Sequence, residues 1–192
     1  MAGELAERIA EARRTLEQRP DGHLPLPLRR RVRAAMGSGV EAHERRLRLA
    51  RRTAEHVLPR WRAERPGDER PDELIALAER VRAGAADREE AAHTAHRFMN
   101  DVYALLDKEV SEPAVNAAMA AERLIAVARW DDDAERLDET DDDEDSDGYD
   151  WETAFYASMV DAPSLPKEGV AEHAQPRRAF WRWYLDQAAR PD

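Results

Sequence analysis

Residues 114–130 read AVNAAMAAERLIAVARW, and this stretch says more about the fold than any other part of the chain. Most of its side chains are small, and no proline or glycine interrupts it. A helix covered by small side chains lets neighbouring helices approach closely. We therefore expect a helix over 114–130 at the centre of an all-α fold, a multi-helix bundle.

The segments on both sides of this stretch have the spacing of amphipathic helices. β-branched residues are sparse, and no segment alternates apolar and polar residues over the length of a strand. Proline and glycine clusters separate the periodic segments, as at Pro20-Asp21-Gly22 and Pro66-Gly67-Asp68. The pattern predicts an extended connection over 23–28, a loop over 161–175, and helices that include residues 5–16, 29–36, 43–61, 71–83, 87–109, 151–159 and 176–189.

Two kinds of ring side chain have predictable positions in these helices. His43 lies in the apolar stripe of its helix, so we expect a buried histidine with a hydrogen-bond partner. Trp181 and Trp183 are 200° apart around the last helix and cannot both face inward. We expect one of the two to be buried and the other to lie near the surface.

The composition is that of a single globular domain, which we expect to span residues 1–192. The chain has 192 residues and no cysteine, which excludes disulfides, cysteine-ligated zinc and a thiol nucleophile. The N-terminal stretch MAGELAERIAEARR has no apolar core, so we expect no signal peptide. Apolar runs are also too short for a membrane span, and we expect a soluble cytoplasmic protein without a membrane partner.

Charge is distributed unevenly along the chain. The formal net charge is −11, yet residues 131–152 alone hold fourteen acidic residues and one arginine. Residues 26–65 instead hold twelve arginines and four glutamates. The acidic run 131–150 has almost no apolar residue, so we expect a solvated, flexible segment between two helices of the bundle. An acidic chain without a recognition motif gives no reason to expect a nucleic-acid partner.

Two short patterns resemble metal sites. Glu90 and His93 match the Glu-x-x-His motif of helical di-metal proteins, and His96 lies one turn further on. A di-metal site needs this motif on two helices, however, and the chain has one copy. His93 also falls opposite the apolar stripe of its helix, which places it towards solvent.

The other pattern is an incomplete calcium loop in the acidic run. Asp143, Asp145 and Asp147 followed by Gly148 reproduce the first half of an EF-hand loop. Position twelve of that loop, which should be a bidentate glutamate, is Ala154. Because so acidic a run matches such a pattern by composition alone, we expect no cofactor or specific metal.

The sequence contains no signature of covalent catalysis or of phosphate binding. There is no G-x-S-x-G elbow, and Met36-Gly-Ser-Gly39 lacks the lysine and the preceding strand of a phosphate loop. We expect none of the serines to have a plausible base, and therefore no enzymatic activity: Ser38, Ser111, Ser146, Ser158 and Ser164.

Two stretches of the chain resemble a known protein family. The first is VLPRW at 57–61, followed by PGDERPDELIALA at 66–78 and Gly84. The second is WETAFYAS at 151–158, followed by RAFWRWYL at 178–185. Together, from about Leu47 to Leu185, they resemble the fifth numbered family of bacterial polymorphic-toxin immunity proteins, which is all-helical. Where that family often has a glycine or small-residue turn, this chain has Asp161-Ala-Pro163.

The resemblance implies an inhibitor that binds and neutralises a cognate bacterial toxin, and it carries over no catalytic residue. Many antibacterial toxins are nucleases with cationic clefts, which the acidic run could occupy as a phosphate mimic. We expect the partner-binding residues to be Asp141, Asp142, Asp143, Glu144, Asp145, Asp147 and Asp150, with Tyr149 or Trp151 as an aromatic anchor.

Other interpretations stay open from the sequence. The acidic run could equally be a solubilising linker between two helices. The whole chain could also be a helical adaptor protein or a metal-binding helical protein. The sequence does not identify the toxin or the oligomeric state.

Overall fold

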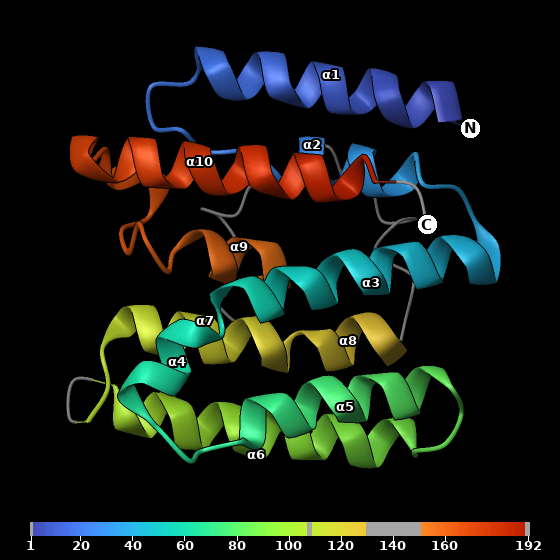
Figure 1. Cartoon of the computed structure of the whole chain (residues 1–192), viewed down its shortest axis with the longest axis vertical. Helices are drawn as coiled ribbons and strands as arrows, with labels where there is room; N and C mark the ends of the chain where they lie inside the picture. Colours follow the sequence, from blue (N-terminus) through green and yellow to red (C-terminus); the bar gives the residue numbers. More distant parts are fainter. Residues whose placement is uncertain (1, 107–108, 130–150, 191–192) are drawn as a thin grey trace. The chain divides into compact units, whose positions relative to one another are not determined.

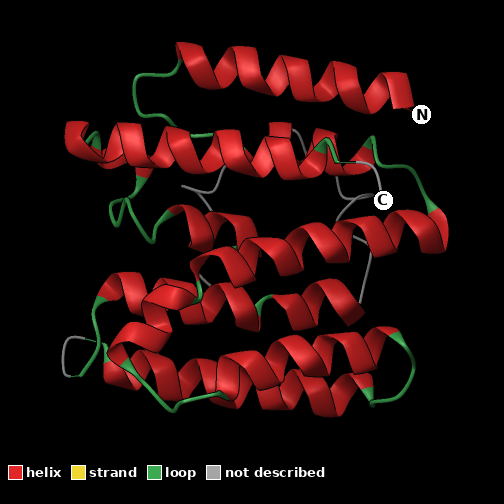
Figure 2. Ribbon diagram, in the orientation of Figure 1, coloured by secondary structure: helices red, strands yellow, loops and turns green. Residues whose placement is uncertain are grey.

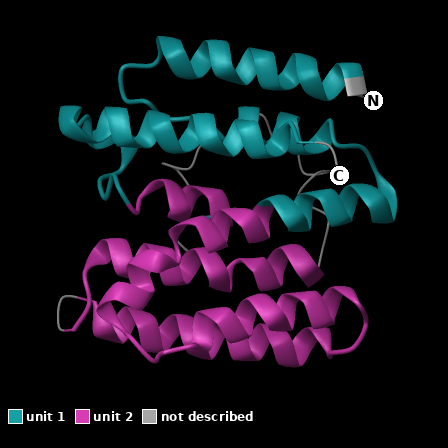
Figure 3. Ribbon diagram, viewed as in Figure 1, with its two compact units in different colours: residues 1–49, 132–151, 161–192 teal, residues 50–131, 152–160 magenta. Residues whose placement is uncertain are grey.

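The structure is a computed structural model that describes residues 2–106, 109–129 and 151–190 (Figure 1). Within these residues the secondary structure is helical, apart from an isolated bridge between Leu106 and Val110 (Figure 2). The predicted all-α class is therefore confirmed. The chain forms two compact units, residues 1–49, 132–151 and 161–192 in unit 1 and residues 50–131 and 152–160 in unit 2 (Figure 3). That residues 1–192 behave as one domain stays a prediction.

Unit 2 is a cluster of short helices around one central helix. It contains α4 (Pro59–Glu64), α5 (Arg70–Arg82), α6 (Arg88–Leu105), α7 (Glu112–Glu122), α8 (Leu124–Arg129), α9 (Thr153–Ser158) and the end of α3 (Gly39–Val57). Helix α7 packs against α4, α5, α6 and α9, and α5 packs in addition against α6 and α8. Helix α7 therefore has neighbours on several sides, as expected for the centre of a bundle.

The small side chains of α7 explain its central place. Every residue from Ala114 to Glu122 is buried, and five alanines among them are inaccessible to solvent. Ser111 begins the helix, because its hydroxyl accepts a hydrogen bond from the Ala114 amide at 3.4 Å. The predicted helix over 114–130 is nevertheless two helices, since the chain turns at Arg123 before α8 begins.

Prolines account for several differences from the predicted helix boundaries. Pro59 has no N–H to donate to the carbonyl of Glu55, so the predicted helix over 43–61 is broken into α3 and α4. Pro27 instead lies in the first turn of α2 (Leu26–Ala34), where an N–H would have no helical partner. Pro176 lies inside α10 (Ala171–Ala188), which begins five residues earlier than predicted.

Unit 1 is built from α1 (Ala2–Gln18), α2, the start of α3, a short 3-10 helix η3 (Pro166–Glu168) and α10. Helix α1 packs along both α10 and α2 (Figure 1). Trp181 is fully buried, whereas Trp183 is partly exposed, so the predicted division between the two tryptophans is confirmed. The guanidinium of Arg29 lies 5.0 Å from the centre of the Trp181 ring, which places a buried cation on an aromatic face.

Arg177 joins two loops of unit 1 to α10. Its side chain is 1% exposed and donates to the carbonyls of Asp21 and Ala162, each at 3.2 Å, and to that of Ser164. The loop at Gly22 approaches α10 so closely that a Cβ there would lie 2.1 Å from the carbonyl oxygen of Ala174. Glycine is therefore required at position 22, where φ is +65°.

Candidate functional site

Most of the predicted partner-binding residues lie outside the described residues: Asp141, Asp142, Asp143, Glu144, Asp145, Asp147, Tyr149 and Asp150. The first half of the incomplete calcium loop, Asp143 to Gly148, lies there too, whereas Ala154 at its position twelve is buried in α9. Trp151 is described, and it is half-buried two residues before α9 begins. All six residues of α9 are buried, which confirms that the chain returns to the core after the acidic run.

The histidines predicted from sequence occupy surface positions. Glu90, His93 and His96 are exposed on α6, as the helical spacing predicted for His93. Across the described ranges, no group of three or more histidine or carboxylate side chains is placed to hold a metal ion. His43, which we expected to be buried, is only partly buried near the start of α3.

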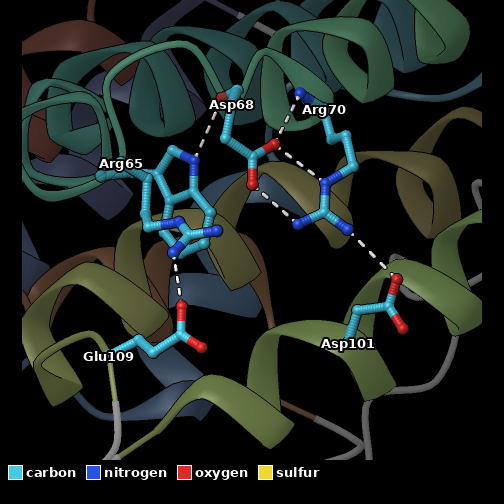
Figure 4. A network of polar contacts seen from close by, with 6 residues as sticks. Arg65, Asp68, Arg70, Asp101 and Glu109 are labelled. Carbon is cyan, nitrogen blue, oxygen red and sulfur yellow. Dashed lines mark hydrogen bonds and ion pairs between the residues drawn. The ribbon is translucent and has the colours of Figure 1, made fainter.

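A network of charged side chains surrounds the turn between α4 and α5 in unit 2 (Figure 4). The buried Trp61 donates its indole N–H to the backbone carbonyl of Asp68 at 3.2 Å. The Asp68 carboxylate accepts two hydrogen bonds from the Arg70 side chain, at 2.8 Å from Nε and 2.7 Å from Nη2, and one from the Arg70 amide at 3.3 Å. Arg70 also reaches Asp101 on α6 at 3.1 Å and lies over the ring of Phe98 at 5.3 Å. The turn is therefore held in one conformation against α6.

The start of the same turn is tied to the segment that leads into α7. Glu64 accepts hydrogen bonds from the Ser111 amide at 2.8 Å and from the Ser111 hydroxyl at 2.7 Å. Arg65 donates to Glu109 at 2.6 Å (Figure 4). Both contacts join residues more than forty positions apart in the sequence, so the network links α4 and α5 to the chain around the central helix.

Hydrogen bonding keeps the carboxylates of the network ionised. The Arg70 side chain holds the pKa of Asp68 below its usual value, and Asp68 in turn raises the pKa of Arg70. The amide and hydroxyl of Ser111 similarly lower the pKa of Glu64. At neutral pH these groups therefore form a fixed set of charges.

The turn encloses an open hollow of about 600 Å³, which we call the α4–α5 hollow. Of the acidic residues at this hollow, Glu69 and Glu73 have exposed side chains with no hydrogen bond or ion pair to the described part of the chain. Because four acidic residues and two arginines line it, the hollow is suited to cationic groups rather than to anions. Its lining residues are Glu64, Arg65, Pro66, Gly67, Asp68, Glu69, Arg70 and Glu73.

A serine and a histidine that the sequence did not connect meet in unit 1. The Ser164 hydroxyl lies 2.7 Å from Nδ1 of His173, so the expectation that no serine has a plausible base partner was wrong for this pair. Ser164 is 6% exposed, so the protein covers almost all of this residue. The pair therefore does not have the accessible oxygen that attack on a substrate requires.

Among the helices that the structure describes, none is both long enough and apolar enough to cross a membrane.

Comparison with protein families gives a match over residues 9–190, to the family described as immunity protein Imm5. The chain belongs to this family. The match covers almost all of the chain and confirms the family resemblance drawn from residues 47–185. Comparison with curated protein sequences finds no match. Membership of the Imm5 family supports a role in toxin immunity, in which the protein binds a toxin.

Proposed function

We propose that this Imm5-family protein binds a cognate bacterial toxin in the cytoplasm and neutralises it without enzymatic activity of its own. The family match over residues 9–190 is the observation that supports this function. In this proposal the partner is a protein rather than a nucleic acid or a membrane, and no cofactor takes part.

The proposed mechanism is occlusion of a cationic active site, such as that of a nuclease. The negative charge of residues 131–152 supports this mechanism, since that stretch contains fourteen acidic residues and one arginine. Complementary charge accelerates encounter and helps exclude other partners. We assign the contact to residues 141–150 and the aromatic anchor to Tyr149 or Trp151. Trp151 is half-buried two residues before a fully buried helix, so a partner can contact the part of this residue that stays exposed.

The α4–α5 hollow provides a second acidic surface in this proposal. Its walls are fixed by the Asp68–Arg70 and Glu64–Ser111 hydrogen bonds, so little conformational entropy is lost when a partner docks. Glu69 and Glu73 are exposed at its edge, ready to pair with lysine or arginine side chains of a toxin. Charges carried by a turn of fixed backbone favour a long-lived complex, whereas the acidic run favours rapid encounter.

The first experiment is a pull-down of the tagged protein from native lysate at low and high salt, read by mass spectrometry. The proposal expects one stoichiometric partner that carries a toxin domain, and weaker capture at high salt because salt screens exposed charges. A stoichiometric partner without toxin activity would contradict the proposal and favour a helical adaptor.

The second experiment separates the two acidic surfaces by binding kinetics with the captured toxin. Neutralising residues 141–145 should lower the association rate constant, and E69Q/E73Q should raise the dissociation rate constant. The matched control is E4Q/E7Q, which removes two exposed carboxylates from α1. Rate constants equal to those of the control would refute the role assigned to the altered surface.

A further inference from the structure

One flank of α6 is contacted by the helices on both sides of the acidic run. Arg129, the last residue of α8, donates to Glu89 in the first turn of α6 at 2.6 Å. The Tyr156 hydroxyl of α9 lies 2.9 Å from that of Tyr103 in the last turn of α6. The chain therefore leaves α8 beside one end of α6 and enters α9 beside the other end. These two contacts are fourteen positions apart, which is about 21 Å along a helix.

The flank of α6 between these two contacts is exposed. Asn100 and His96 lie one turn and two turns before Tyr103 on the same side of the helix, and both are exposed. In the part of the chain that the structure describes, the large apolar side chains that stay exposed are Val40, at 78%, and Tyr103, at 37%. Tyr103 therefore gives this flank an aromatic surface that a partner can reach.

The Tyr103 side chain is held in place before any partner arrives. Its backbone belongs to α6, and its hydroxyl is hydrogen-bonded to that of Tyr156, which is 1% exposed. A tyrosine has two rotatable side-chain bonds, so contacts at both ends fix the position of its ring. Docking against such a ring costs little conformational entropy, and exposed tyrosines of this kind are common among the residues that dominate binding energy.

We propose that this flank of α6 is a contact surface for the cognate toxin, with Tyr103 as a further aromatic anchor. This role of α6 rests on the toxin-binding function proposed above. The run that we assigned to the toxin is joined at both ends to helices that contact this flank, so a toxin bound there is within reach of Tyr103. The charge of that run selects a cationic partner, and a lysine or arginine of the toxin packs on the face of the Tyr103 ring. The Asn100 amide provides a donor and an acceptor beside the ring.

The first test compares variants of the full-length protein for affinity to the toxin from the pull-down, once purified. Y103A removes the ring and should raise Kd by about tenfold or more, mainly through faster dissociation. Y103F keeps the ring and loses only the hydroxyl, so its Kd should rise by no more than about threefold. V40A removes the other exposed apolar side chain and is the matched control, with Kd unchanged. A Y103A complex as tight as that of V40A, or an equal loss in Y103F, would overturn the role of the ring.

Chemical nitration gives a second test in the wild-type protein, where the folding of a variant is not in question. Tyr156 and Tyr184 are 1% and 2% exposed, so among the described tyrosines Tyr103 should react first with tetranitromethane. Peptide mapping by mass spectrometry should find nitrated Tyr103 in the free protein and a loss of that nitration in the toxin complex. Equal nitration of Tyr103 in both samples would show that the toxin leaves this flank uncovered.

The comparison of wild type with Y103A also separates this role from the function on which it rests. A toxin that binds wild type and Y103A equally well leaves the proposed function intact and removes the α6 surface. If wild type binds no toxin, both the function and the surface fail.

Discussion

The close approach of the loop at Gly22 to α10 allows a prediction with a closely matched control. Gly22 and Gly169 have nearly the same backbone conformation, with φ of +65° and +63°. An added Cβ at Gly22 would lie 2.1 Å from the carbonyl oxygen of Ala174, whereas nothing lies within 4 Å of a Cβ at Gly169. G22A and G169A therefore share the left-handed backbone cost, and G22A alone has the steric conflict.

The magnitude follows from these two terms. A left-handed conformation costs an alanine about 1–2 kcal/mol, which is the whole expected effect of G169A. In G22A the loop must also move by about 1 Å, an overpacking cost of roughly 1–3 kcal/mol. That movement weakens the bond from Arg177 to the Asp21 carbonyl, which adds about 1 kcal/mol. We expect G22A to destabilise the protein by about 3–6 kcal/mol in total.

Thermal denaturation followed by circular dichroism and tryptophan fluorescence measures both variants under the same conditions. At about 2–4 °C per kcal/mol for a chain of this length, Tm should fall by roughly 10 °C in G22A and roughly 4 °C in G169A. If G22A is no less stable than G169A, the loop does not approach α10 as described, and the steric argument fails.

Three further predictions concern unit 2 and the chain as a whole. S111A removes the hydroxyl that caps α7 and binds Glu64, and should lower the free energy of unfolding by about 1–2 kcal/mol in chemical denaturation. Burial raises the pKa of Glu122 above its usual 4.5, so this carboxyl contributes stability at low pH that is lost as the pH rises. The free energy of unfolding of the wild type should therefore fall relative to that of E122Q between pH 4 and pH 8. A difference between the two proteins that stays constant over this range would contradict the argument. Calorimetry should give one transition whose calorimetric and van't Hoff enthalpies agree, and two separate transitions would refute the predicted single domain.

Apolar periodicity was sufficient to predict the class of the fold and its central helix. The small side chains over 114–130 predicted a helix at the centre of the bundle, and residues 114–122 of that stretch are buried. The boundaries were harder to predict, since proline has opposite effects at different positions. Pro59 ends a helix, while Pro27 and Pro176 are tolerated within one, and only the tertiary contacts decide between these outcomes.

The candidate surface was only partly accessible to sequence reasoning. The Pro66-Gly67-Asp68 motif located the turn between α4 and α5 correctly. The partners that fix this turn, Asp101 and Glu109, are exposed carboxylates on distant parts of the chain, and nothing in their local sequence distinguishes them from other surface acids. The same holds for Ser164 and His173, whose contact depends on how η3 directs the chain back towards α10.

The burial of α7 from Ala114 to Glu122 has a consequence for how the protein is made on the ribosome. Helix α9 covers α7, yet its last residue is synthesised 36 positions after the end of α7. At about 5–20 residues per second, this interval lasts roughly two to seven seconds. During that time α4, α5 and α6 have already emerged, but an apolar face of α7 has no cover. Nascent chains that stop before α9 should therefore engage chaperones or aggregate, and the C-terminal part of the chain protects a helix that was translated before it.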